Sequence, residues 1–180
     1  MALLSIHRFP DKILAKQATP VDAIDGKMTA LLNNMADTMY SANGIGLAAN
    51  QVGALERVIV VDTDHDNRGK KLLKLVNPEI VEAEGEIIYE EGCLSVVDYT
   101  AEIQRAARVL VRGWTIDQKE IEIEAEGLQS VCLQHEIDHL DGTLFIDHIS
   151  RLKRELYRKR LKKQGSDAGS GTSNTSVPSI

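Results

Sequence analysis

The segment His135-Glu136-Ile137-Asp138-His139 places two histidines four residues apart, in a stretch with helical periodicity. Residues four apart lie on the same face of a helix, so the two imidazoles can bind one metal ion. Glu136 then lies beside the water that such a metal activates, where a carboxylate can accept a proton. Apolar neighbours on the same face direct the imidazoles inward, where unpartnered polar groups are costly. The pattern therefore predicts a metal site on a helix, with Glu136 as its general base.

A catalytic metal of this kind needs a third protein ligand and an open position. The metzincin pattern fails, because Phe145 stands where its third histidine would be. Glu155 lies far enough along the sequence from the two histidines to be the third ligand, as in other zinc peptidases. It lies, however, in a strongly basic segment. Cys132 shares the histidine face, yet it lies about 10 Å along the helix axis from His139. Such a short side chain does not reach a metal between the imidazoles, so we interpret Cys132 as a pocket or core residue.

The other cysteine, Cys93, follows an expected strand in the segment Glu90-Glu91-Gly92-Cys93-Leu94-Ser95. Gly92 permits close backbone approach, and the next backbone amide can point toward a reacting group. A cysteine after a strand is ordinarily a buried apolar residue. Beside a two-histidine helix that lacks a third ligand, we predict instead that Cys93 binds the metal.

Three segments together resemble the motifs of the peptide deformylase family, in the family's order and with similar spacing. They are GIGLAANQ at 44–51, EGCLS at 91–95 and HEIDHLDG at 135–142, and the resemblance covers about residues 3–160. It implies an α+β fold in which antiparallel β-sheets pack around a central metal-binding helix. It also implies a metal-dependent hydrolase that removes the formyl group from the N-terminal methionine of newly synthesised proteins and releases formate.

The resemblance implies a role for each matched residue. Its metal is usually Fe²⁺, with Zn²⁺, Ni²⁺ or Co²⁺ able to replace it, one per chain. The implied metal ligands are Cys93, His135 and His139. Glu136 is implied to be the general base and acid, while Gln51 and the backbone amide of Leu94 stabilise the oxyanion. The implied substrate-binding residues are Ile45, Gly46, Glu91, Val131 and Cys132, the last two near the methionine pocket.

Two positions depart from the common family pattern. Val96-Val97-Asp98-Tyr99-Thr100 follows the second motif where many members have a proline and later an arginine, whose position corresponds to Thr100. Asn50 replaces the proline often found before Gln51. Since the first departure borders the peptide cleft, we expect it to affect peptide preference beyond methionine and not the chemistry.

The elements that position these residues follow from hydrophobic periodicity. An amphipathic helix is expected at 22–42, capped by Asp22, with Met28, Met35 and Met39 filling the core. The segment 44–53 is too glycine-rich for a regular element. Two further helices are expected, around 127–140 and at about 149–163. Strands are expected at 57–62, 72–76, 80–84, 86–89, 109–114 and 120–125, the last half-solvated because its apolar and acidic residues alternate.

The charge is distributed unevenly. The segment Arg151–Lys163 holds eight basic residues and one glutamate, a net charge of +7, while the whole chain carries −6. The remainder therefore carries −13. Since a basic helix on an acidic body fits a polyanionic partner, we expect a ribosome contact through residues 151–163, besides the N-formylmethionyl nascent peptides that serve as substrate.

Composition places the chain among soluble globular proteins. Of its 180 residues, 43% are apolar and 27% charged, and there is no apolar run long enough for a membrane helix. No signal peptide is evident at the N-terminus, so we expect a cytoplasmic protein. We expect one catalytic domain at 1–164, including the basic helix, and a flexible Gly/Ser/Thr-rich tail at 165–180.

Two other functions are compatible with the histidine pattern. The first is a His-Glu-x-x-His metallopeptidase that cuts internal peptide bonds, and the short chain and missing third zincin ligand oppose it. The second is an inactive metal-binding relative. The presence of Gln51, Cys93 and Glu136 opposes the second, because a structural metal site needs neither a base nor an oxyanion donor.

Overall fold

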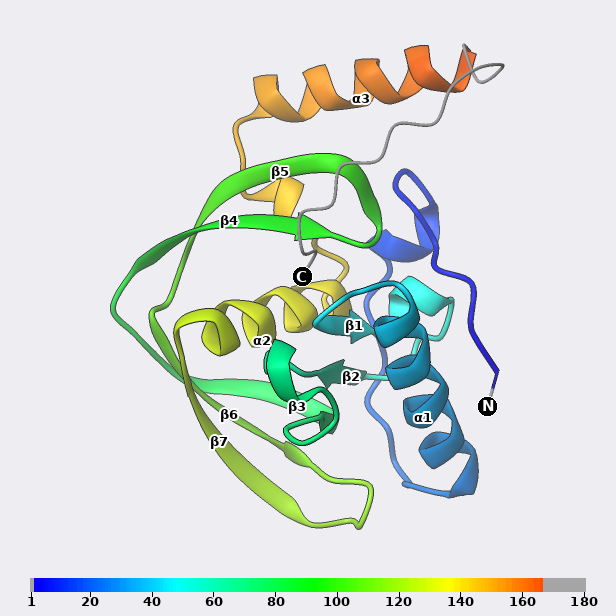
Figure 1. The fold of residues 1–180 in the computed structure, drawn as a ribbon, viewed down its shortest axis with the longest axis vertical. Coiled ribbons are helices and arrows are strands. Elements are labelled where there is room, and N and C mark those ends of the chain that lie inside the picture. The colour runs from blue at the N-terminus through cyan, green and yellow to red at the C-terminus, as the bar shows by residue number, and fades with distance from the viewer. Residues whose placement is uncertain (1, 167–180) are drawn as a thin grey trace.

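A computed structural model describes residues 2–166 of the chain (Figure 1). Its helices are α1 (Gly26–Ser41), α2 (Gly127–Leu140) and α3 (Arg151–Ser166), with short 3-10 turns at Lys12–Ala15, Ala49–Val52, His65–Asn67 and Phe145–Asp147. Its strands are β1 (Gly46–Ala48), β2 (Val58–Val61), β3 (Leu73–Glu84), β4 (Ile87–Cys93), β5 (Val96–Arg105), β6 (Arg108–Trp114) and β7 (Glu120–Glu126).

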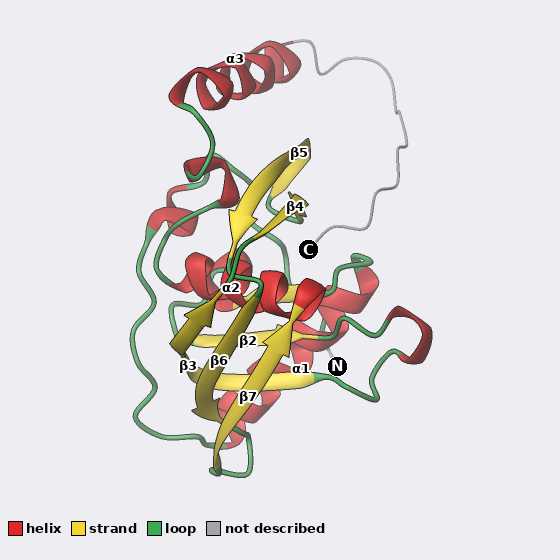
Figure 2. Cartoon of the chain, turned by 90° about the vertical axis from the view of Figure 1, so that its left-hand side faces the viewer, coloured by secondary structure: helices red, strands yellow, loops and turns green. Residues whose placement is uncertain are grey.

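The strands form two antiparallel sheets around α2. One sheet has five strands in the order β1-β2-β3-β6-β7, and the other is the β4–β5 hairpin. Helix α2 lies between the five-stranded sheet and the hairpin, and α3 lies on the far side of the hairpin (Figure 1, Figure 2). The expected α+β architecture with a central helix is confirmed. Ten of the 14 residues of α2 are buried, because the helix is covered on several sides.

Strand β2 separates the two largest apolar clusters of the core. Ile59 and Val61 pack in the cluster that contains α2, whereas Val58 and Val60 pack with the buried face of α1. All four residues of β2 are therefore buried. A strand covered on both faces needs a continuous apolar run, and the sequence VIVV supplies one.

Helix α1 buries the stripe that its periodicity predicts, including Met28, Met35 and Met39. Its start differs from the expectation. Asp25 caps the helix, since its side chain accepts a hydrogen bond from Met28 N at 2.9 Å, and the predicted cap at Asp22 is wrong. Both aspartates precede the apolar stripe, and only the backbone geometry at Asp25, extended at φ −101° and ψ −175°, decides between them.

The strand predictions need three corrections. Residues 46–48 form the short strand β1, although the surrounding segment is rich in glycine. The two strands expected at 72–76 and 80–84 are one strand, β3, whose register shifts around Pro78. Proline is accommodated there because a bulge needs no ladder hydrogen bond from it. Strand β5 was not expected, since its exposed face interrupts the apolar pattern with polar residues.

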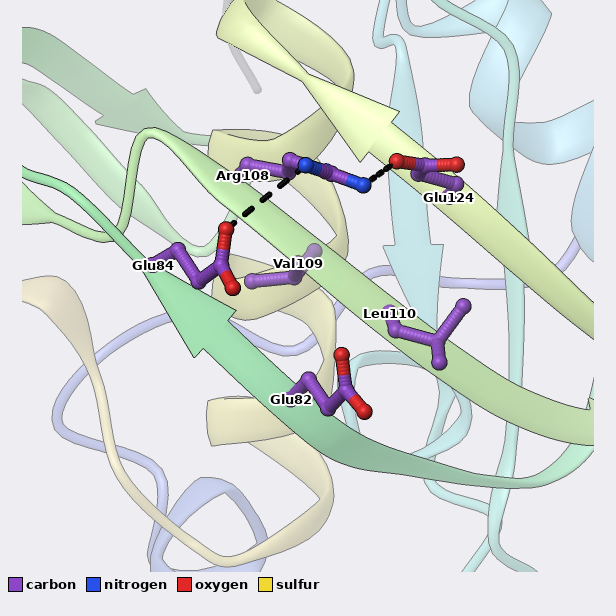
Figure 3. A pocket seen from close by; sticks show the side chains of 6 residues that line it. All are labelled: Glu82, Glu84, Arg108, Val109, Leu110 and Glu124. Atoms are coloured by element: carbon purple, nitrogen blue, oxygen red, sulfur yellow. Dashed lines mark ion pairs between the residues drawn. The ribbon is translucent and has the colours of Figure 1, made fainter.

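The outer face of the five-stranded sheet is charged. In β7 the glutamates are exposed and the intervening isoleucines half-buried, as the alternation predicts. Arg108 forms ion pairs with Glu84, at 3.6 Å, and with Glu124. These three residues, with Glu82, Val109 and Leu110, line a hollow of about 100 Å³ (Figure 3).

Helix α3 matches the basic helix expected at about 149–163. Tyr157 is its buried residue, at 3% exposure, while Leu152 and Leu156 are 71% and 57% exposed. Residues 167–180, most of the predicted tail, lie outside the described part of the chain. Between residues 2 and 166, no helix has the length and apolar character that crossing a membrane requires.

The end of α2 depends on a glycine. Gly142 has a φ of +73°, and the Thr143 N–H bonds back to the Asp138 carbonyl at 2.9 Å, which closes the helix. An added Cβ at Gly142 would also lie 2.8 Å from the Ala15 carbonyl oxygen. The chain therefore turns out of α2 in this way only with glycine at this position.

Replacing Gly142 with alanine is expected to lower the free energy of unfolding by about 1–3 kcal/mol, because the new side chain meets both backbone strain and a fixed carbonyl. Denaturant unfolding measures the loss. Gly26→Ala is the matched control, since a Cβ on Gly26 meets nothing within 4 Å. Equal stabilities of the two variants would show that the turn at the end of α2 does not require glycine at position 142.

Candidate metal centre

Helix α2 presents His135 and His139 side by side. Both are 1% exposed, and their rings lie 5.0 Å apart between centroids at an interplanar angle of 72°. The i, i+4 spacing produces this arrangement, because the two side chains project from successive turns of one face.

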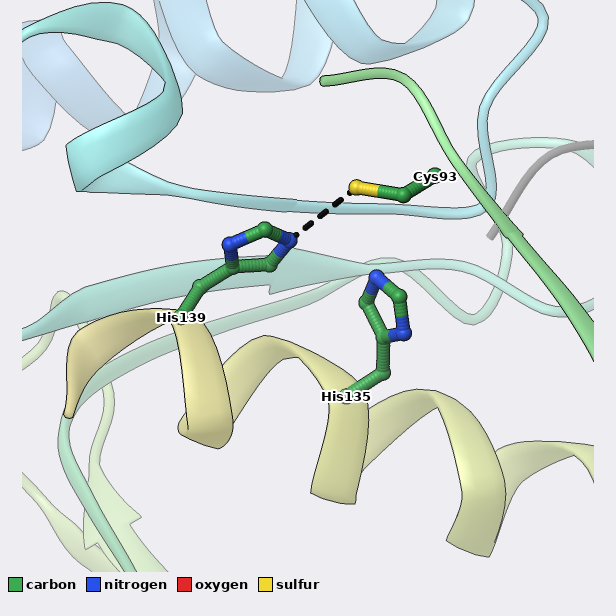
Figure 4. Close-up of side chains that lie close together, drawn as sticks. All are labelled: Cys93, His135 and His139. Carbon is green, nitrogen blue, oxygen red and sulfur yellow. Dashed lines mark hydrogen bonds between the residues drawn. The ribbon is translucent and has the colours of Figure 1, made fainter. Parts of the chain in front are cut away.

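Strand β4 ends at Cys93 and brings the thiol to the same point. Cys93 Sγ lies 3.2 Å from His139 Nε2, and one ligand atom from each of Cys93, His135 and His139 lies within 4.8 Å of the others (Figure 4). All three side chains are buried. Cys132 is absent from this group; its thiol instead faces the Ile45 carbonyl oxygen at 3.6 Å. The structure therefore brings together the three residues predicted as ligands.

The chemistry of this group fits a divalent metal. His135 Nε2 is buried and has no hydrogen-bond partner among residues 2–166, a costly state that a metal ion relieves. Burial, reinforced by neighbouring His135, holds the pKa of His139 well below its ordinary value, so its imidazole is in the neutral form that binds metals. Burial and the charge of Glu136 raise the pKa of the Cys93 thiol, so its deprotonation depends on a metal.

A buried carboxylate orients His135. His135 Nδ1 donates to Glu91 Oε2 at 2.8 Å, which leaves Nε2 directed at the metal position. Arg105 donates to both oxygens of Glu91, at 2.6 and 3.0 Å. Burial acts to raise the pKa of Glu91, but the hydrogen bonds from His135 and Arg105 outweigh it and lower the pKa. Glu91 is therefore a carboxylate that fixes the orientation and tautomer of a metal ligand.

The same network continues to the surface. Arg105 also donates to Asp138 Oδ2 at 2.5 Å, and His148 Nε2 lies 2.7 Å from that oxygen. No motif or spacing in the sequence singles out Arg105. Asp138 belongs to the third motif, HEIDHLDG, but the sequence does not indicate which residue its side chain contacts. Only the side-chain contacts that join β5 to α2 show that these two residues support the histidine.

Glu136 lies on the inner side of the same helix. Its side chain is fully buried, and neither carboxylate oxygen has a hydrogen-bond partner among the described residues. Burial, with a smaller effect from the charge of Glu91, raises the pKa of Glu136 well above its ordinary value. A Cβ on Gly46 would overlap Glu136 Oε1, so the β1 backbone approaches this carboxylate as only glycine allows. Glu136 is thus an unpaired acid beside the ligand set.

Gln51 approaches Cys93 from the turn after β1. Its Nε2 donates to Ser95 Oγ at 3.1 Å and lies 3.5 Å from Cys93 Sγ. Its Oε1 accepts from Ala48 N at 2.8 Å, which directs the amide NH₂ toward the thiol. Leu94 follows Cys93 directly, in the turn between β4 and β5. Both predicted oxyanion donors therefore come from segments that adjoin the metal ligands.

The residues expected to bind substrate have different surroundings. Ile45, Val131 and Cys132 belong to the buried cluster that contains the apolar residues of α2. Gly46 lies against Glu136 and Cys132. Glu91 is fully buried, with its carboxylate engaged by His135 and Arg105. Thr100, at the departure from the family pattern, is exposed and donates to Glu90 Oε1 at 3.0 Å.

Comparisons with known proteins agree on one family. Residues 3–155 match the family model described as Polypeptide deformylase. A peptide deformylase of Thermodesulfovibrio yellowstonii is 55% identical over 162 residues, which cover 90% of this chain and 98% of the relative. Another, from Syntrophobacter fumaroxidans, is 48% identical over 93% of this chain and 99% of the relative. The crystal structure of a peptide deformylase from Legionella pneumophila superposes with a TM-score of 0.87 at 44% identity, covering 94% of this chain and all of that one.

The two cysteines allow a direct test of the ligand set. Cys93→Ser is expected to lower metal affinity more than about 100-fold, because loss of a mere outer-shell partner already costs about 10–100-fold. Cys132→Ser is the matched control and keeps a stoichiometry near one metal per chain. Metal analysis after dialysis against a chelator measures both. Retention by the Cys93 variant together with loss by the Cys132 variant would show that α2 supplies all three ligands.

Proposed function

The chain belongs to the peptide deformylase family, and we propose that its buried centre hydrolyses the N-formyl group of N-formylmethionyl nascent peptides, releasing formate. One observation carries this proposal: an unpaired, buried acid, Glu136, lies beside three convergent ligands. A structural metal site has no use for such an acid, whereas amide hydrolysis needs one.

Cys93, His135 and His139 would hold the metal. A divalent ion supplies Lewis acidity there, which makes water nucleophilic at neutral pH and polarises a carbonyl oxygen. We assign Fe²⁺ as the metal in the cell, with Zn²⁺, Ni²⁺ or Co²⁺ able to replace it; one thiolate with two imidazoles suits each of these ions. The buried thiolate offsets part of the metal charge, and it is also the oxidisable ligand.

Glu136 transfers the proton. Its carboxylate accepts the proton of the attacking water and then delivers it to the leaving amine. The burial that raises the pKa of Glu136 favours the second half of this task, because the protonated form persists until the amine departs. No other acid among the described residues is both fully buried and without a hydrogen-bond partner.

Gln51 and Leu94 stabilise the charge that develops on the formyl oxygen. The Gln51 amide NH₂ and the Leu94 backbone N–H are the two donors, each contributing about 3 kcal/mol by comparison with other oxyanion sites. The contact of Gln51 Oε1 with Ala48 N supports this role, because it fixes which end of the amide faces the centre.

The substrate lies along β1 and β4 in this proposal. Ile45 and Gly46 bind the peptide, and Val131 with Cys132 forms the wall of the methionine pocket. Because the Glu91 carboxylate is committed to His135 and Arg105, Glu91 contributes to the cleft through its backbone.

The basic helix α3 is the part of the molecule that we expect to bind the ribosome. Seven of the eight basic residues in 151–163 are exposed, on a helix held away from the acidic sheet. Ribosomal RNA is a dense polyanion, so α3 gains affinity by releasing condensed counterions. We therefore propose a ribosome contact through α3, in the cytoplasm, where nascent chains emerge.

Glu136→Gln is expected to keep the metal and lower kcat for formate release by about 10²–10⁴-fold, since ligand binding survives and proton transfer does not. Formate release from a formyl peptide measures the loss, and an N-acetyl peptide and an internal peptide bond distinguish a metallopeptidase. Turnover near the wild-type rate with the metal bound would remove Glu136 from the role of base.

Reversing two exposed charges of α3, with Lys159→Glu and Lys162→Glu, is expected to weaken co-sedimentation with ribosomes and reduce its salt dependence. Each lost phosphate contact lowers the slope of log affinity against log salt by about 0.9. Lys12→Glu with Lys27→Glu, which reverses two exposed charges elsewhere, is the control for net charge. If both double variants bound ribosomes equally, α3 would have no specific role in ribosome binding and would be an ordinary solvent-exposed helix. Charge reversal is preferable to truncation, because truncation also removes the buried Tyr157.

A further inference from the structure

Tyr157 is the buried residue of helix α3, which also meets the rest of the molecule through Leu161, packed on the same apolar cluster, and through the Arg154–Asp147 ion pair. The Tyr157 side chain is 3% exposed and belongs to the apolar cluster that contains the metal ligand Cys93. Leu152 and Leu156, which the helical pattern also marks as apolar, are mostly exposed. The bonds from α3 to the β4–β5 hairpin therefore come from Tyr157 and nearby Arg160.

Tyr157 bonds to the backbone just after the metal ligand. Its hydroxyl donates to the Val97 carbonyl at 3.0 Å, and Arg160, one turn along α3, donates to the Asp98 carbonyl. The β4–β5 register shifts between Glu91 and Cys93, so the hairpin ladder is interrupted beside the ligand. Asp98 there has a φ of +54°. Side chains of α3 thus bond to the hairpin where its own ladder is irregular.

A series of neighbouring aromatic rings connects Tyr157 to the histidine ligand His135. The Tyr157 and Tyr99 rings lie 4.6 Å apart, the Tyr99 and Phe145 rings 6.2 Å, and the Phe145 and His135 rings 6.1 Å. On its other side Tyr157 stacks with Phe9 at 6.0 Å. The Phe9 backbone N–H donates to the Ser95 carbonyl at 2.8 Å, in the turn that contains Leu94.

We propose that Tyr157 is a positioning residue of the metal centre. It holds the turn after Cys93 against α3, so that the thiolate stays directed at the two histidines and the Leu94 N–H stays directed at the reacting carbonyl. The effect on Cys93 requires only metal binding, whereas the effect on Leu94 rests on the proposed function. The basic helix is thereby part of the support of the catalytic centre as well as a surface for polyanions.

Four variants test this role, all compared at a temperature where each is folded. Tyr157→Phe removes the hydroxyl and keeps the ring, while Tyr157→Ala removes both. Leu156→Ala, on the adjacent exposed position, controls for changes in α3. Met28→Ala, in the separate α1 cluster, controls for a general loss of stability. The measurements are the rate of Co²⁺ loss to a chelator, the cobalt–thiolate absorption band, and kcat and KM on a short formyl peptide.

Tyr157→Ala is expected to speed Co²⁺ loss about tenfold or more and to shift the thiolate band, with a smaller change for Tyr157→Phe. Leu156→Ala is expected to match the wild type, and Met28→Ala to lower Tm without faster metal loss. Wild-type metal retention in both Tyr157 variants would overturn the proposal, and so would equally fast loss from Met28→Ala. If Tyr157→Ala does not fold, Tyr157→Phe decides alone. A wild-type protein that released no formate would contradict the proposed function and leave the metal comparison intact.

Discussion

Helix α2 carries His135, Glu136 and His139 into the buried interior, and much of the fold serves to accommodate these three side chains. Burial of polar groups costs several kcal/mol each unless they find partners, so such a helix is unstable alone in an apolar core. Glu91 supplies a partner to His135, and Arg105 in turn balances the charge of Glu91. A metal ion would complete the balance, because the His135 Nε2 lone pair has no partner among residues 2–166.

The unpaired state of Glu136 follows from the same constraint. A hydrogen bond or ion pair to this carboxylate would stabilise it and lower its ability to exchange protons. The β1 backbone fills the space beside it at Gly46 without supplying a charged partner. The fold therefore supplies a partner to His135 Nδ1 and supplies none to the Glu136 carboxylate, which leaves an imidazole nitrogen free for a metal beside an acid free to exchange a proton.

Segments distant in sequence hold the turns around the centre. The N–H groups of His7 and Phe9 donate to the carbonyls of Gln51 and Ser95, at 2.7 and 2.8 Å, so the N-terminal segment joins the two turns that adjoin Cys93. From the other end of the chain, Tyr157 reaches the same hairpin. The loops that would contact substrate are thus anchored by both ends of the described chain, and rigid support of this kind favours precise geometry.

The sequence by itself determined the local features of this site. The i, i+4 histidines, the helix at 127–140 and the three motifs are properties of short segments, and periodicity and residue chemistry are sufficient to read them. Cys93 was separable from Cys132 because the rise of a helix limits reach along one axis. Only the tertiary structure decided which partners those segments meet: that Arg105 and Asp138 support His135, that β5 exists, and that Tyr157 rather than Leu152 or Leu156 is buried. These outcomes depend on contacts between residues tens of positions apart, and a pattern along the chain carries no information about which distant segment will cover it.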